Sequence, residues 1–153
     1  PMARLLLLAH APLATALQAV ARHAFPECAD RLAALDVMPE SHAEEIEALA
    51  RQCILALSKG TDPETLVLTD VFGATPANVA QRLADGVRVR AVSGVNVPML
   101  WRALNYCGLP LDELVTRSLA GGSQGVLAMA STRPQNQAFQ VTPHDSQHHH
   151  HQQ

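Results

Sequence analysis

The sequence predicts an α/β fold in which a mainly parallel β-sheet is covered by helices on both faces. Two patterns carry this prediction. Short apolar runs typical of buried strands alternate with segments whose apolar residues recur at helical spacing, and the connections between them are short. Because 153 residues suffice for one hydrophobic core, we expect one domain over residues 2–132 and a flexible tail over residues 133–153.

The strands are predicted from short aliphatic runs bounded by turn residues. The first run, "RLLLLA", is continuously apolar after its arginine and fits a strand buried on both faces of a sheet. The expected strands cover residues 4–9, 31–38, 66–71, 87–92 and 126–130. The last of them follows a long helical connection, so we expect it to lie differently from the others.

The helices are predicted from capping residues, first-turn prolines and glycine stops. Pro12 fits the first turn of a helix, and Ser41-His42-Ala43-Glu44 fits a capping box that opens a second helix ending near Gly60. Three further helices are expected from Thr75-Pro76 to Asp85-Gly86, from Asn96 to Gly108, and from Leu109-Pro110 to Gly121-Gly122.

Composition argues against several classes of protein. The net charge of −3 gives no reason to expect a nucleic acid as a partner. Cys28, Cys53 and Cys107 form no CxxC pair, which disfavours a disulfide framework or a zinc site and suits a reducing compartment. The apolar stretch near the start is too short to span a bilayer and lacks a signal-peptide pattern, so we expect a cytoplasmic protein. The four histidines 148–151 belong to the tail and are left out of the fold.

Polar residues follow three of the predicted strands, at the edge where parallel sheets of this kind form their sites. His10 ends the first strand, Asp70 ends the third, and "SGVN" over residues 93–96 follows the fourth. A carboxylate that accepts a hydrogen bond from one ring nitrogen fixes the histidine tautomer and leaves the other nitrogen free as a nucleophile. We therefore expect Asp70 to orient His10.

The same edge is expected to bind an anion such as a phosphoryl group, without a metal or another cofactor. Helices that begin after these strand ends offer free N–H groups and a positive dipole end. Gly73 permits a close backbone approach, and Thr75 adds a hydroxyl donor. The candidate phosphate-binding residues are Ala11, Gly73, Ala74, Thr75, Ser93, Gly94 and Asn96.

Each of these signals also has a purely structural explanation. A lone histidine at a strand end is a structural residue in most proteins, and Asp70 by itself can form a turn. Thr75-Pro76 is ordinary helix capping, and "SGVN" is an ordinary loop. Their joint placement at neighbouring strand ends is what favours a functional site.

Three ordered segments give the chain a family resemblance: "LLLLAH", "LVLTDVFGATPAN" and "SGVNVPML". They resemble the IIA component of the mannose-type (mannose–fructose–sorbose) phosphoenolpyruvate-dependent phosphotransferase system, over about residues 4–130. The resemblance implies a doubly wound sheet of flavodoxin type whose last strand is antiparallel and exchanged in a homodimer. It also implies that His10 carries the phosphoryl group, that Asp70 hydrogen-bonds this histidine, and that Thr75 faces the phosphate.

The partners implied by the resemblance are the phosphocarrier HPr as donor and a mannose-type IIB protein as acceptor. The membrane would be involved only indirectly, through permease components. Two segments depart from the family pattern: Ala11 and Pro12 replace a glycine after the histidine, and G-G-S-P has become Gly73-Ala74-Thr75-Pro76. His10 and Asp70 are both present, so we expect phosphorylation to be retained.

Three other functions stay open at this point. The chain fits a regulatory protein in which phosphorylated His10 controls a partner without sugar transport. It also fits a IIA-like phosphoryl donor domain of a dihydroxyacetone kinase system, although "GVNVPM" favours the mannose branch. A small-molecule binding domain of flavodoxin type is the third, but the sequence contains no GxGxxG fingerprint to support it.

Overall fold

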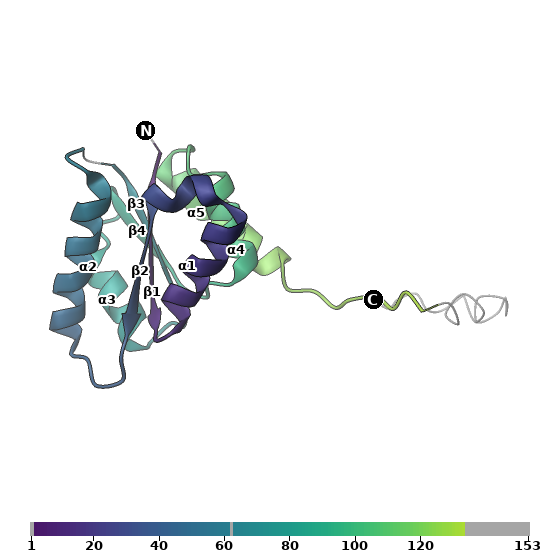
Figure 1. Cartoon of the computed structure of the whole chain (residues 1–153), viewed down its shortest axis with the longest axis horizontal. Helices are drawn as coiled ribbons and strands as arrows, with labels where there is room; N and C mark the ends of the chain where they lie inside the picture. The colour runs from purple at the N-terminus through teal and green to yellow at the C-terminus, as the bar shows by residue number, and fades with distance from the viewer. Residues whose placement is uncertain (1, 62, 134–153) are drawn as a thin grey trace.

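The computed structural model describes residues 2–61 and 63–133 of the chain. Its centre is a parallel sheet with the strand order β2-β1-β3-β4. The strands are β1 (Arg4–His10), β2 (Leu32–Val37), β3 (Thr65–Thr69) and β4 (Val89–Val92). A helical connection joins each strand to the next, so the carboxyl ends of the strands lie at one edge of the sheet (Figure 1).

Helices cover both faces of this sheet, which confirms the predicted α/β architecture (Figure 1). One face carries α1 (Leu13–Ala24), α4 (Val97–Asn105) and α5 (Leu111–Gln124). The other face carries α2 (Ala43–Ser58) and α3 (Thr75–Leu83). A short 3-10 helix, η1 (Pro26–Arg31), joins α1 to β2 and was not predicted from the sequence.

The leucine run of β1 fixes the strand between the two layers of helices. Leu5 and Leu7 pack with α1, α4 and α5, whereas Leu6 and Leu8 pack with α2 and α3, and all four are completely buried. Each buried leucine contributes about 2 kcal/mol of hydrophobic stabilisation. The strand is therefore held firmly on both sides up to the point where His10 emerges.

Two helices begin one residue away from their predicted caps. The N-cap of α2 is His42, not Ser41, and the His42 N–H donates to Glu45 Oε1 at 3.3 Å. Adjacent glutamates at positions 44 and 45 allow either register, and the structure uses the second. The N-cap of α3 is Ala74, so Thr75 is the first residue of that helix and not its cap.

Strand β4 is shorter than predicted because Asp85 holds the preceding turn. The Oδ1 atom of Asp85 accepts hydrogen bonds from the N–H groups of Val87, Arg88 and Val89 at 2.8–2.9 Å. The backbone at residues 87 and 88 therefore folds around a carboxylate, and the strand begins at Val89.

Helix α5 does not break at Gly121 and Gly122, contrary to prediction, but continues to Gln124. These glycines let α5 approach α4 closely. A Cβ atom at Gly121 would lie 2.7 Å from Arg102 Cβ, and one at Gly122 would lie 2.7 Å from Met99 Cε. The two glycines thus serve helix packing, which outweighs their poor helix propensity of about 1 kcal/mol each.

The predicted strand over residues 126–130 is not formed in this single chain. After α5 the backbone extends away from the sheet (Figure 1), and Val126, Leu127 and Met129 are 74%, 70% and 92% exposed. A strand needs the edge of another strand to pair its N–H and C=O groups, and this segment meets none among the residues that the structure describes.

Candidate functional site

His10 and Asp70 lie side by side at the carboxyl edge of the sheet, as predicted. His10 is the last residue of β1, and Asp70 directly follows β3, the neighbouring strand. Asp70 Oδ2 lies 2.7 Å from His10 Nδ1 and also accepts the His10 backbone N–H at 2.9 Å. The carboxylate is an acceptor only, so we assign the ring proton to Nδ1, which leaves a lone pair on Nε2.

The two side chains differ in their access to solvent. The His10 side chain is 50% exposed, whereas that of Asp70 is 14% exposed. A reagent approaching from solvent therefore meets the imidazole first. The carboxylate lies behind the ring, in the place of an orienting group.

Asp70 is held in its charged form by its hydrogen bonds. Partial burial raises the pKa of this carboxyl, but the backbone and ring N–H groups of His10 and the Val71 N–H lower it by more, so the net pKa is below the ordinary value. The Val71 N–H donates to Asp70 Oδ1 at 2.9 Å. Both carboxylate oxygens are thus engaged, and the group stays a fixed acceptor for the imidazole.

The loop after β4 is tied to the end of β3 and therefore flanks the site. The Gly94 N–H donates to the Asp70 carbonyl at 3.0 Å, and the Val95 N–H donates to the Thr69 carbonyl at 2.9 Å. Gly94 has a φ of +87°, a left-handed conformation that side chains other than glycine rarely adopt. Ser93 and Gly94 thus reach the same edge as His10, as the sequence predicted.

Asn96 acts as the cap of α4, as expected, and has a second structural partner. Its Oδ1 accepts the Met99 N–H at 2.9 Å, and its Nδ2 donates to the Gly122 carbonyl at 3.0 Å. Both ends of the amide are therefore engaged within the protein. The side chain that we expected to bind phosphate joins α4 to α5.

The N-termini of three helices lie at this edge, and they are capped differently. At α1, the Thr15 N–H donates to Asp36 Oδ1 at 3.1 Å, and the Thr15 hydroxyl donates to Asp36 Oδ2 at 2.7 Å. At α4 the cap is Asn96. At α3 the N-cap residue is Ala74, whose side chain cannot cap, and among the described residues no side chain bonds the first-turn N–H groups.

The Ala11 amide is also engaged, which differs from our expectation that it would face a phosphate. Its N–H donates to the Val37 carbonyl of β2 at 2.9 Å. In the other departure from the family pattern, the left-handed conformation falls on Gly73, with a φ of +91°, whereas Ala74 has an extended backbone with a φ of −95°. Alanine is therefore accommodated at position 74 without strain.

The face on which His10 stands follows from the register of β1. His10 pairs with Val37, which is buried among residues of α2 and α3, and Leu6 and Leu8 lie on that same side. Side chains on a strand alternate, so His10 continues this row toward the α3 side of the sheet. The histidine and the uncapped α3 N-terminus thus share a face.

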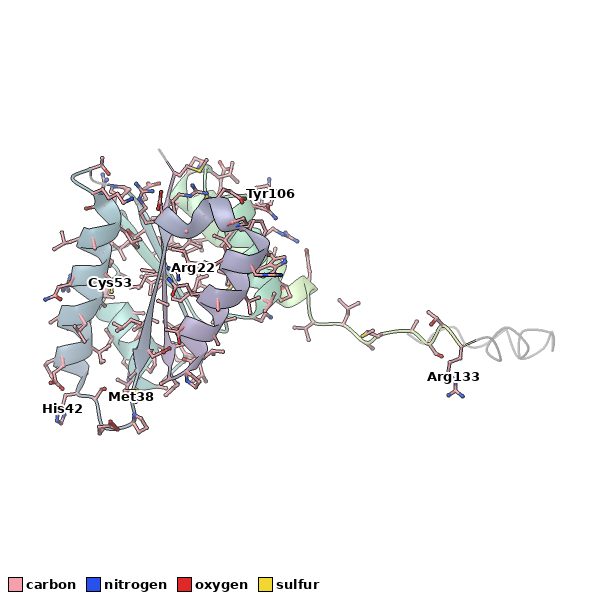
Figure 2. All side chains as sticks on the ribbon, viewed as in Figure 1. Arg22, Met38, His42, Cys53, Tyr106 and Arg133 are labelled. Atoms are coloured by element: carbon pink, nitrogen blue, oxygen red, sulfur yellow. The ribbon has the colours of Figure 1, made fainter. Side chains whose placement is uncertain are left out.

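Sequence reasoning missed two features of this edge. Asp36 is a polar residue near the end of β2, and a comparison of strand ends would have found it. Exposed apolar side chains also lie near this edge: Val71 and Phe72 follow Asp70 in the sequence, and Met38, labelled in Figure 2, follows β2. Side chains of this kind can bury apolar area against another protein.

No helix in the described part of the chain has the length and hydrophobicity that crossing a bilayer requires. Over the same residues, no three histidine, cysteine or acidic side chains gather closely enough to share a metal ion. The four-histidine segment 148–151 and nearly all of the predicted tail lie outside the described residues.

Comparison with known proteins relates the fold and the site to one family. Residues 4–118 match the family described as the PTS (phosphotransferase system) fructose IIA component. No curated protein matches the chain.

Solved structures agree with this family match. The mannose/sorbose-specific IIA subunit from Enterococcus faecalis is 25% identical with a TM-score of 0.76, covering 87% of this chain and 98% of that one. The IIA protein associated with a fucose utilisation operon in Streptococcus pneumoniae is also 25% identical, with a TM-score of 0.66 and coverages of 83% and 93%. The EIIA component from Streptococcus agalactiae, at 19% identity, shares the fold with a TM-score of 0.71 and coverages of 83% and 97%.

The hydrogen bonds of Asp70 predict a pH-dependent contribution to stability. The pKa of this carboxyl is lowered in the folded chain, so its charge stabilises the fold above the ordinary value of 3.8, and the contribution is lost as pH falls through the lower folded value. We expect Asp70→Asn to lower the free energy of unfolding by about 1–2 kcal/mol at pH 7 and by less at pH 3. Urea unfolding across this range measures the difference.

The control is Glu113→Gln, which changes an exposed carboxylate in the first turn of α5. Its effect should stay within about 0.5 kcal/mol at every pH. A difference between wild type and Asp70→Asn that is the same at pH 7 and pH 3 would contradict the assignment.

Proposed function

The chain belongs to the fructose IIA component family of the phosphotransferase system, and from this premise we propose that it is a phosphocarrier whose His10 receives and passes on a phosphoryl group. The observation that carries the proposal is the 2.7 Å contact between His10 Nδ1 and Asp70. That contact directs the proton to Nδ1 and leaves Nε2 as the nucleophile on a half-exposed ring.

The proposed donor is the phosphohistidine of HPr, protonated on its second ring nitrogen. The Nε2 lone pair of His10 attacks phosphorus while the bond between phosphorus and the donor nitrogen breaks, and that bonding pair returns to the donor ring. The donor leaves as neutral imidazole, and His10 keeps its Nδ1 proton, so no proton has to move during the step. Asp70 stabilises the positive charge that His10 gains.

The phosphoryl group on Nε2 is proposed to lie against the N-terminus of α3. This N-terminus has no side-chain cap, and Thr75 supplies a hydroxyl there. Gly73, in the left-handed conformation, shapes the loop between Asp70 and the helix, and Ser93 and Gly94 border it from the next strand. Backbone N–H groups at a helix start favour a phosphate without a metal ion.

The second transfer is proposed to go from His10 to a mannose-type IIB protein by the same chemistry in reverse. Transfer between imidazoles requires the two rings to meet on one line through phosphorus, so both partners must contact the rim of the site. Val71 and Phe72 are 51% and 73% exposed on that rim. They are suited to bury apolar area against each partner in turn.

The chain is expected to become labelled when it is incubated with radioactive phosphoenolpyruvate, enzyme I and HPr. The label should be acid-labile, as a phosphohistidine is, and should map to His10. His10→Gln should lose at least 99% of the label, because the nucleophile is gone. Gel autoradiography and peptide mapping measure both results.

The matched control is His23→Gln, since His23 is an exposed histidine in the last turn of α1. That variant should be labelled like the wild type. Failure of the wild-type chain to accept label from phosphorylated HPr would rule out the proposed function.

We also propose that two copies of the chain form a dimer by exchanging residues 126–130. β4 is an edge strand, and beside it lies a groove of about 350 Å³. Its lining includes Ala91 and Val92 of β4 and Val115 and Leu119 of α5. The exposed apolar residues of the extended segment match this lining, and an antiparallel strand placed here would cover the open edge of β4.

The exchange predicts that Leu127→Asp combined with Met129→Asp turns a dimer into a monomer, since two carboxylates would have to lie against the apolar side chains of the groove, among them Val92, Val115 and Leu119. Light scattering should give twice 16.4 kDa for the wild type and 16.4 kDa for this variant. Leu55→Asp, at a 70% exposed position on α2, should remain dimeric. A wild-type chain that is monomeric at 100 µM or more would refute the proposed exchange.

A further inference from the structure

Asp36 accepts two hydrogen bonds near the proposed phosphoryl site, and the proposed mechanism does not use them. Its Oδ1 accepts the Thr15 N–H at 3.1 Å, and its Oδ2 accepts the Thr15 hydroxyl at 2.7 Å. The two residues come from different elements, because Asp36 lies on β2 and Thr15 lies in the first turn of α1. Both carboxylate oxygens of Asp36 therefore accept hydrogen bonds from the first turn of α1.

The hydrogen bonds from Thr15 to Asp36 cap α1, because the N-cap residue of this helix provides no side-chain cap. The N-cap position of α1 is Pro12, whose side chain makes no capping hydrogen bond. Without Asp36, the positive end of the α1 dipole would face the edge of the sheet uncompensated. The carboxylate therefore neutralises a helix terminus that would otherwise attract an anion.

Asp36 is also close to His10 along the sheet. It pairs with Ala9 in the register between β1 and β2, so it lies one strand and one residue away from the histidine. Neighbouring strands are about 4.8 Å apart, so the two backbones are adjacent, and α1 begins at Leu13, three residues after His10. The Asp36 side chain shares the face of Ala9 and α1, opposite to that of His10, so its charge acts on an anion at this edge through the α1 N-terminus that it caps.

Two carboxylates thus bracket the turn that leaves β1, with opposite consequences for a phosphoryl group. Asp70, from β3, bonds His10 itself and stabilises the cationic ring. Asp36, from β2, bonds the helix that follows this turn and removes one source of positive potential. Of the helix N-termini at this edge, that of α3 is left without a side-chain cap.

We propose that Asp36 is a positioning residue that weakens the hold on the phosphoryl group, so that His10 passes it on readily. A carrier must bind its phosphoryl group no more tightly than its donor and acceptor do. By masking the α1 terminus, Asp36 raises the transfer potential of phosphorylated His10. This inference rests on the proposed function, because it concerns the same histidine.

The test is the equilibrium constant for phosphoryl transfer between HPr and the full chain. Asp36→Asn removes the charge with little change in shape, and should raise the phosphorylated fraction of His10 so that the equilibrium constant increases about two- to fivefold. The purified phosphorylated variant should also hydrolyse more slowly. An equilibrium constant depends only on the end states, so changes in how fast HPr docks do not affect it.

Two matched variants separate this effect from a merely structural role. Thr15→Val removes the hydroxyl bond but keeps the Asp36 charge, and Asp85→Asn neutralises a carboxylate that holds a turn at the opposite edge of the sheet. Both should lower the thermal midpoint of unfolding and leave the equilibrium constant within 1.5-fold of wild type. Should Asp36→Asn fail to fold, Asp36→Ser keeps a short acceptor and serves the same comparison.

The outcomes separate this inference from the function on which it rests. Labelling of wild-type His10 with an unchanged or lowered equilibrium constant in Asp36→Asn overturns the role of Asp36 alone. Equal shifts in all the variants overturn it too, because the effect would then follow stability. Absence of labelling in the wild type overturns both proposals.

Discussion

One carboxylate joins the ends of two neighbouring strands, and the arrangement of the site depends on it. Asp70 accepts the backbone and ring N–H groups of His10, which lies 60 positions away in the sequence. The pairing is possible because β1 and β3 run parallel in a register that brings both residues to one edge. The buried leucines of β1 hold that register, so core packing and site geometry have the same cause.

The N-termini of the three helices around this pair differ in whether a side chain caps them. Asp36 neutralises the first turn of α1, and Asn96 fastens α4 to α5. The first turn of α3 has no such partner and lies on the same face as His10. We propose that these caps leave the α3 N-terminus as the place for an anion; the exposed side chains of Val71 and Phe72 lie beside it.

The sequence allowed the sheet and the His10–Asp70 pair to be predicted because both follow from local patterns. Apolar runs predict strands, and parallel strands bring their ends together. The features that were not predicted depend on contacts between residues far apart in the sequence. Gly121 and Gly122 stay helical because they contact α4 about 20 residues earlier, and the bond between Thr15 and Asp36 spans 21 positions. Residues 126–130 have the composition of a strand, but within residues 2–61 and 63–133 no strand edge pairs with them.

The central claim is that Asp70 holds the proton of His10 on Nδ1 so that Nε2 is free to carry a phosphoryl group. Long-range ¹H–¹⁵N correlation spectra of the imidazole, recorded at pH 8 with and without phosphorylation, test it most directly. We expect a protonated Nδ1 and an unprotonated Nε2 in the free chain, with phosphorus attached at Nε2 afterwards. A proton on Nε2 in the free chain, or phosphorus on Nδ1, would contradict the account.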